Sequence, residues 1–163
     1  ANYPDNYFDV ITASEIIEHC NIPEELLTEV KRILRPGGLF WGTTPSASGI
    51  SYKLMGAKWS VLSPPDHLQL FSPKAIKHIF KQTNFESIKI TTFGFGVSEV
   101  INEYKNLIKS KDNSVNSFNR VQSDYALNES LTKNKSRKMI KDLLNNTLNV
   151  LRIGDSLKIR AIK

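Results

Sequence analysis

This chain of 163 residues lacks several features, and each absence excludes a class of protein or site. A single cysteine, Cys20, excludes an internal disulfide and is typical of a reducing compartment. No apolar run is long enough to span a membrane, and no basic-then-apolar leader opens the chain, so we expect a cytoplasmic protein. No basic segment carries the interleaved aromatic residues that stack nucleic-acid bases, so we expect no specific nucleic-acid partner. The glycine pair Gly37–Gly38 follows a predicted helix instead of opening one, which excludes a phosphate-binding loop.

Basic residues are concentrated in the last part of the chain, whereas acidic residues occur at a similar frequency throughout. Residues 1–100 contain nine Lys or Arg and ten Asp or Glu, whereas residues 101–163 contain thirteen and six, which gives net charges of −1 and +7. A basic segment of this kind is typical of a solvated helical face, although it could also face a polyanion or an anionic membrane.

The apolar, β-branched run over residues 8–13 predicts a strand that is buried on both faces. A helix should follow, capped by Asn21 and ended by the turn at 36–38. Its apolar side is formed by Leu26, Leu27, Val30, Ile33 and Leu34. A second strand is predicted over 39–44. Strand, helix and strand in so short a segment indicate a βαβ unit, hence parallel pairing.

The second half of the chain predicts further elements of an α/β fold. The connection from Pro45 to Pro65 is long enough to indicate a functional loop. Ser72 should cap a helix that has Pro73 at its first position, and Asn84 should end that helix in a left-handed conformation. Strands are then predicted over 86–93 and 157–162.

Residues 97–153 predict a helical insertion before the last strand, with helices over 98–110 and 134–152 around a polar stretch, 112–132. The later helix has a basic side and an apolar stripe of Met139, Ile140, Leu143, Leu144, Leu148 and Leu151. This pattern is typical of a helix that covers a sheet. It also fits a lid, a dimer contact or a helix that lies on a membrane surface.

The first predicted strand leads into two carboxylates and an imidazole. Glu15, Glu18 and His19 stand at i, i+3 and i+4, so a helical turn would place them on one face. They could hold a divalent cation such as Mg²⁺, or His19 could act as a general base oriented by a carboxylate. In the alternative interpretation, Glu15 caps amides, Glu18 is exposed and His19 is a boundary residue.

Other candidate residues lie in or next to the long connection. His67, in the segment Pro64-Pro65-Asp66-His67-Leu68, is either a buried structural histidine or a second proton acceptor. Trp59 and Tyr52 are candidates for contact with a substrate, although Trp59 could equally be a packing residue. Cys20 has no neighbour in the sequence that would activate it as a nucleophile.

Three segments of the chain, together with Glu15, Glu18 and His19, resemble class I S-adenosylmethionine-dependent methyltransferases. These segments are Phe8-Asp9-Val10-Ile11-Thr12-Ala13, Leu34-Arg35-Pro36-Gly37-Gly38-Leu39 and His67-Leu68-Gln69-Leu70-Phe71-Ser72-Pro73. Ubiquinone-biosynthesis O-methyltransferases look most similar. The resemblance implies a single α/β domain over residues 1–163 with a Rossmann-like, three-layer α/β/α fold and a final antiparallel strand. It implies that Ala13, Ser14 and Glu15 bind the methionine end of S-adenosylmethionine. Because some relatives bind a divalent cation through Glu-x-x-Glu-His, it also implies Glu15, Glu18 and His19 as ligands.

The sequence departs from this family at its start, because the first three strands and the glycine-rich loop of the family have no counterpart. We therefore expect the substrate-side part of a methyltransferase that acts on a small molecule, inactive as this fragment alone. His19 or His67 would remove the acceptor's proton. The alternative is a non-catalytic, methyltransferase-like binding or partner module.

Overall fold

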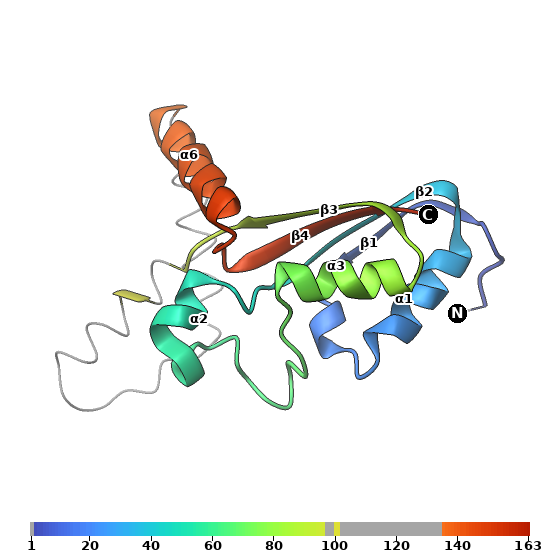
Figure 1. Ribbon diagram of the computed structural model, residues 1–163, viewed down its shortest axis with the longest axis horizontal. Coiled ribbons are helices and arrows are strands. Elements are labelled where there is room, and N and C mark those ends of the chain that lie inside the picture. The colour runs from blue at the N-terminus through green and yellow to red at the C-terminus, as the bar shows by residue number, and fades with distance from the viewer. Residues whose placement is uncertain (1, 97–99, 102–134) are drawn as a thin grey trace.

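The computed structural model describes residues 2–96, 100–101 and 135–163 and shows a four-stranded sheet with helices (Figure 1). The elements in chain order are β1 (Phe8–Ser14), η1 (Ile17–His19), α1 (Pro23–Ile33), β2 (Leu34–Pro45), α2 (Ile50–Met55), η2 (Gly56–Lys58), α3 (Pro73–Gln82), β3 (Glu86–Phe93), α6 (Lys135–Leu151) and β4 (Ser156–Ile162). No helix within these described ranges is both long enough and apolar enough to cross a bilayer.

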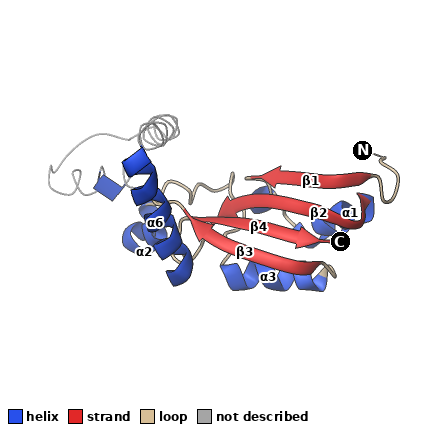
Figure 2. Ribbon diagram, turned by 90° about the horizontal axis from the view of Figure 1, so that it is seen from above, coloured by secondary structure: helices blue, strands red, loops and turns tan. Residues whose placement is uncertain are grey.

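The strand order is β1-β2-β4-β3, as Figure 2 shows from above the sheet. β1 and β2 pair in parallel, with Ala13 opposite Gly42, which confirms the predicted βαβ unit. β4 lies between β2 and β3 and is antiparallel to both, which confirms the predicted final antiparallel strand. Because β1 and β2 run in the same direction, their carboxyl ends meet at one edge of the sheet.

Helix α1 begins and ends differently from the prediction. Its N-cap is Ile22 and carries no side-chain hydrogen bond, so the predicted capping role of Asn21 is wrong. Pro23 occupies the first position of the helix and has no backbone N–H group. One donor fewer in the first turn therefore requires a capping acceptor. The helix ends at Ile33, before the predicted turn, because the residues from Leu34 onward already belong to β2.

Helix α3 begins as predicted. The Ser72 hydroxyl accepts a hydrogen bond from the Ala75 amide at 3.2 Å, and Pro73 occupies the first turn. Asn84, which follows the helix, has a φ of 58° and so adopts the predicted left-handed conformation.

We expect Ser72→Ala to lower the free energy of unfolding by about 1 kcal/mol, because the substitution leaves an amide of the first turn without its acceptor. Urea denaturation followed by circular dichroism measures this effect. Ser72→Asp is the matched control, since a carboxylate also caps a helix, and it should retain wild-type stability. A loss of stability in both variants would contradict the capping role.

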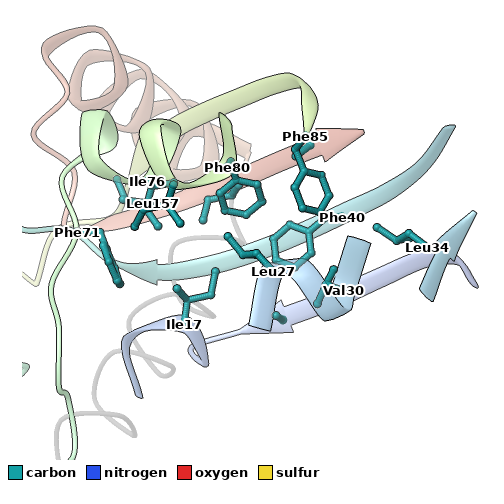
Figure 3. Packing of buried hydrophobic residues seen from close by; sticks show 14 residues of the cluster. Ile17, Leu27, Val30, Leu34, Phe40, Phe71, Ile76, Phe80, Phe85 and Leu157 are labelled. Atoms are coloured by element: carbon teal, nitrogen blue, oxygen red, sulfur yellow. The ribbon is translucent and has the colours of Figure 1, made fainter. Parts of the chain in front are cut away.

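The hydrophobic core lies between the sheet and helices α1 and α3 (Figure 3). Phe40 on β2 is fully buried at its centre, with ring centroids 5.2 Å from Phe80 and 6.3 Å from Phe85. Leu157 and Ile159 extend this layer along β4 and are also fully buried. The core therefore ties the parallel pair to the antiparallel half of the sheet.

Helix α6 confirms the predicted helix over 134–152, but its apolar stripe does not cover the sheet. It rises from the side of the sheet opposite α1 and α3 (Figure 1). Leu148 is buried, whereas the other five stripe residues are exposed, so the prediction of a sheet-covering stripe is wrong apart from Leu148. The helix predicted over 98–110, apart from residues 100 and 101, and the polar stretch 112–132 lie outside the described residues.

Candidate functional site

The site forms where β1 and β2 end side by side. Ser14 and Thr43 face each other across the parallel pair, and their hydroxyl oxygens are 2.9 Å apart. The chain then turns sharply at Glu15, whose φ of 53° is left-handed and whose amide donates to the Thr43 carbonyl at 2.9 Å. This edge is where ligands bind in open α/β sheets.

The turn after β1 differs from the predicted helical face. Only Ile17–His19 is helical, as a single 3₁₀ turn, and Glu15 stands outside it. Glu18 is fully buried, so the alternative in which it is exposed is wrong. The Thr44 hydroxyl donates to Glu18 Oε2 at 2.8 Å, while Glu18 Oε1 has no hydrogen-bond partner within the described part of the chain. A buried oxygen in this state costs free energy unless something binds to it.

A distant segment closes over this turn and brings His67 to His19. The amides of Leu68 and Gln69 both donate to the Glu18 carbonyl, at 3.0 and 3.1 Å. The Gln69 side-chain amide also donates to the carbonyls of Cys20 and Asn21. As a result, the His19 and His67 ring centroids lie 4.7 Å apart.

Backbone carbonyls fix the tautomer of both histidines. His19 Nδ1 is 2.6 Å from the Asp66 carbonyl oxygen, and His67 Nδ1 is 2.6 Å from the Val61 carbonyl oxygen. A carbonyl only accepts, so Nδ1 carries a proton in each ring, and in the neutral form of the ring Nε2 keeps its lone pair. In this tautomer, the Nε2 atom can bind a metal ion or accept a proton.

Three side chains therefore offer unshared electron pairs to one point. One ligand atom from each of Glu18, His19 and His67 lies within 4.8 Å of the others, and His19 Nε2 is 3.9 Å from Glu18 Oε1. The sequence predicted Glu15 in this set, but His67 takes that place in the structure. Glu15 remains next to the set, close enough to Glu18 for their charges to interact.

The environment of Glu15 raises the pKa of its carboxyl group above the ordinary value of 4.5. The main cause is partial burial, with a further contribution from the negative charge of Glu18, and a hydrogen bond from Thr43 opposes both. The folded protein therefore binds this proton at a higher pH than the unfolded chain does. Stability should fall as the pH rises from 4.5 through the folded-state pKa.

We expect Glu15→Gln to remove this pH dependence and to make the chain slightly more stable than wild type at neutral pH. The gain should be about 0.5 kcal/mol or less, because the side chain is partly exposed and water screens its charge. Thermal unfolding of both proteins across the acidic-to-neutral range measures it, with Glu25→Gln as a surface control. An unchanged pH profile in Glu15→Gln would contradict the assigned cause.

The remaining predicted residues take different places around the site. Ala13 is buried, so only its backbone can contact a cofactor. Trp59 is 2% exposed and packs beside Tyr52, with ring centroids 6.1 Å apart, so Tyr52 presents the accessible ring of the pair. Cys20 lies at the boundary, and burial raises the pKa of its thiol, which does not suit a nucleophile.

A hollow of about 710 Å³ lies near the start of β2, at the opposite end of the sheet from the site. Its cations are already bonded: Lys31 Nζ donates to the Asn84 carbonyl, Arg32 pairs with Glu29, and Lys163 Nζ donates to the Leu34 carbonyl. The three basic residues that line this hollow are therefore already engaged, and we do not take it as the candidate site.

The sequence interpretation did not assign a role to Thr43 or Thr44. Their hydroxyls hold Ser14 and Glu18 at the site. A signal was present, because two threonines end a strand that was predicted to lie parallel to β1, and carboxyl ends of parallel strands share an edge. The carbonyls of Val61 and Asp66, which orient the histidines, had no such signal.

Comparison with known proteins identifies the family of this chain. The model of a methyltransferase domain family matches residues 1–90, which include β1, η1, α1, β2 and α3. A curated relative, the ubiquinone biosynthesis O-methyltransferase of Dechloromonas aromatica (strain RCB), is 26% identical over 120 residues, which are 70% of this chain and 50% of that protein. The chain thus spans about half the length of this relative.

Solved structures show the same fold. A SAM-dependent methyltransferase from Archaeoglobus fulgidus has a TM-score of 0.56 at 18% identity, over 99% of this chain and 62% of that one. Phosphoethanolamine N-methyltransferase 2 of Haemonchus contortus, in complex with S-adenosyl-L-methionine, has a TM-score of 0.56 at 19% identity, over 99% of this chain and 34% of that one. Because the family model covers more than half of its residues and its fold is that of SAM-dependent enzymes, the chain belongs to the methyltransferase domain family.

Proposed function

We propose that this chain forms the acceptor side of an S-adenosylmethionine-dependent methyltransferase that acts on a small molecule. The observation that carries the proposal is the position of Glu18, His19 and His67 at the shared carboxyl edge of the parallel strands β1 and β2. In open α/β sheets this edge holds the ligand. The match to a methyltransferase domain family over residues 1–90 supplies the reaction class.

S-adenosylmethionine would lie against the end of β1. The backbone of Ala13, the hydroxyl of Ser14 and the carboxyl of Glu15 are the groups offered to its methionine end. The rest of the cofactor would bind to residues outside this chain, since the curated relative is about twice as long as the part that matches.

The acceptor would bind between this edge and the connection that carries α2 and η2. The curated relative is named as an O-methyltransferase, so a hydroxyl group is the acceptor we propose. Its oxygen must lose a proton as it takes the methyl group, and Nε2 of His19 or His67 is free to receive it. Tyr52, 37% exposed on α2, would contact the acceptor's body, with buried Trp59 behind it. Most of the rate would come from holding oxygen, methyl carbon and sulfur in line.

The same three side chains fit a divalent cation. Glu18 Oε1 is a buried carboxylate oxygen without a partner, and both histidines are held in the metal-binding tautomer. One carboxylate and two imidazoles suit Mn²⁺ or Zn²⁺ better than the Mg²⁺ suggested by the sequence, because Mg²⁺ prefers oxygen ligands. When bound, such an ion would lower the pKa of the acceptor hydroxyl. Glu18, His19 and His67 would hold it.

The test of this function uses the reading frame that contains the chain, expressed with the residues encoded upstream of Ala1. Calorimetric titration with S-adenosylhomocysteine should show binding, and Glu15→Ala should weaken it by about tenfold through the lost contact at the methionine end. Thr28→Ala, on the exposed side of α1, is the control and should bind as wild type. Absence of binding in the extended protein would overturn the proposal and favour the non-catalytic module.

A further inference from the structure

Helix α6 is attached to the sheet through polar residues and presents an apolar face to solvent. The Asn149 side chain accepts a hydrogen bond from the Thr92 amide at 3.0 Å, and the Asn145 side chain accepts one from the Gly94 amide at 3.1 Å. Between these two residues in the sequence, Leu148 accepts a hydrogen bond from the Thr92 hydroxyl through its backbone carbonyl at 2.9 Å, and its side chain is 4% exposed. These contacts fix which side of the helix faces outward.

The outward side is formed by two adjoining apolar rows. Met139, Leu143 and Val150 form one row, because spacings of four and seven residues return to nearly the same side of a helix. The second row has the same spacing and consists of Ile140, Leu144 and Leu151. All six side chains are 44 to 72% exposed. An amphipathic surface helix normally turns such a stripe toward the protein core, so this face requires another apolar partner.

The segment that forms α6 is basic in sequence. The sequence of α6 contains four basic residues, Lys135, Arg137, Lys138 and Lys141, and a single acidic one, Asp142. A second basic surface lies on the sheet, where Lys89, Thr91, Lys158 and Arg160 line a hollow of about 170 Å³ without any acidic side chain. Lys158 and Arg160 alternate with the core residues of β4, so they lie on the sheet face away from α3, the side from which α6 rises (Figures 1 and 2).

We propose that the apolar face of α6 docks on an anionic membrane surface. Apolar side chains of a helix that lies in the membrane plane enter the boundary between headgroups and acyl chains, and basic residues beside them pair with anionic lipids. The charge argues against a second copy of the chain, because two such basic faces would repel each other. The helix lies on the bilayer, since none of the described helices can cross one.

Vesicle flotation with the 163-residue chain tests this proposal. We expect binding to phosphatidylcholine vesicles that contain about 30 mol % phosphatidylglycerol, and at least about tenfold weaker binding to pure phosphatidylcholine or at high salt. The double variant Leu143→Gln/Val150→Gln should weaken binding to the anionic vesicles by about tenfold or more. Both positions are exposed, so circular dichroism should show an unchanged fold.

Leu54→Gln is the matched control, because Leu54 is 62% exposed but belongs to α2 and not to the apolar face of α6, and this variant should bind as wild type. Two outcomes would overturn the proposal. The first is binding that is equal on anionic and neutral vesicles or unchanged in the double variant. The second is an absence of vesicle binding together with a dimer, measured by light scattering, that the double variant dissociates, since the face would then be a contact between two copies.

Discussion

Replacement of Glu18 by glutamine is expected to remove divalent-cation binding while leaving the fold intact. Wild-type protein titrated with Mn²⁺ to about 100 times its dissociation constant should gain about 2.7 kcal/mol of stability. For a domain of this size, that gain raises the melting temperature by roughly 5 to 10 °C. In Glu18→Gln the increase should disappear, with affinity reduced about 100-fold or more, because a neutral amide replaces the one buried carboxylate of the ligand set.

The fold should survive this substitution for a specific reason. The amide oxygen of glutamine can still accept the hydrogen bond from the Thr44 hydroxyl, now 2.8 Å from Glu18 Oε2. The amide nitrogen takes the place of Oε1 and can donate toward His19 Nε2, which is 3.9 Å from Oε1. Without metal, the variant should therefore be at least as stable as wild type.

Glu25→Gln is the matched control for the metal titration, because Glu25 lies in the exposed first turn of α1, outside the ligand set. Equal Mn²⁺ affinity in wild type and Glu18→Gln would contradict the metal site and leave His19 and His67 as proton acceptors only. The same titration with Mg²⁺ should give the weaker effect, since two of the three ligands are nitrogen.

Replacement of Phe40 by alanine is expected to lower the free energy of unfolding by about 3 to 5 kcal/mol. Phe40 is fully buried, and its ring packs against the rings of Phe80 and Phe85 between β2 and α3 (Figure 3). Alanine leaves a cavity there that the rigid sheet cannot collapse to fill. Since domains are stable by only about 5 to 15 kcal/mol, this loss removes a large share of the total.

Urea denaturation with tryptophan fluorescence measures the effect of Phe40→Ala. Phe40→Leu should cost about 1.5 kcal/mol, because it keeps most of the buried volume. Leu54→Ala, at an exposed position on α2, should change stability by less than about 0.5 kcal/mol. If Phe40→Ala and Leu54→Ala had similar stabilities, the centre of the core would have to lie elsewhere.

The fold was predictable from the sequence where a local pattern determines the structure. Strand β1 forms where its β-branched run predicts it, and α3 follows from the Ser72–Pro73 start and the left-handed Asn84 at its end. The prediction that β1 is buried on both faces was wrong, because β1 is an edge strand of the described sheet and Val10 is 51% exposed. The capping prediction at Asn21 was wrong because Pro23 begins the helix without a side-chain cap. Patterns at element ends compete with one another, so boundaries are harder to predict than the elements themselves.

The candidate site was only half predictable. Glu18 and His19 follow a predicted strand at the edge where ligands bind, so position and chemistry marked them in the sequence. The burial of Glu18 and the arrival of His67 depend on Leu68 and Gln69 donating to the Glu18 carbonyl, a contact across about fifty positions of the chain. No local pattern encodes a hydrogen bond between backbones so far apart.

The sequence by itself determined the parallel βαβ unit and the acidic, imidazole-bearing turn after β1, because hydrophobic period and residue order act locally. The antiparallel direction of the final strand followed only from the resemblance to methyltransferases. Only the tertiary structure decided that Glu18 is buried with one unpaired oxygen, that carbonyls hold both histidines with Nε2 free, and that α6 turns its apolar face outward. These three features of the structure depend on which segments, distant in the sequence, come into contact in the fold. Periodicity predicts that a helix has an apolar face, whereas packing between distant segments determines what that face contacts.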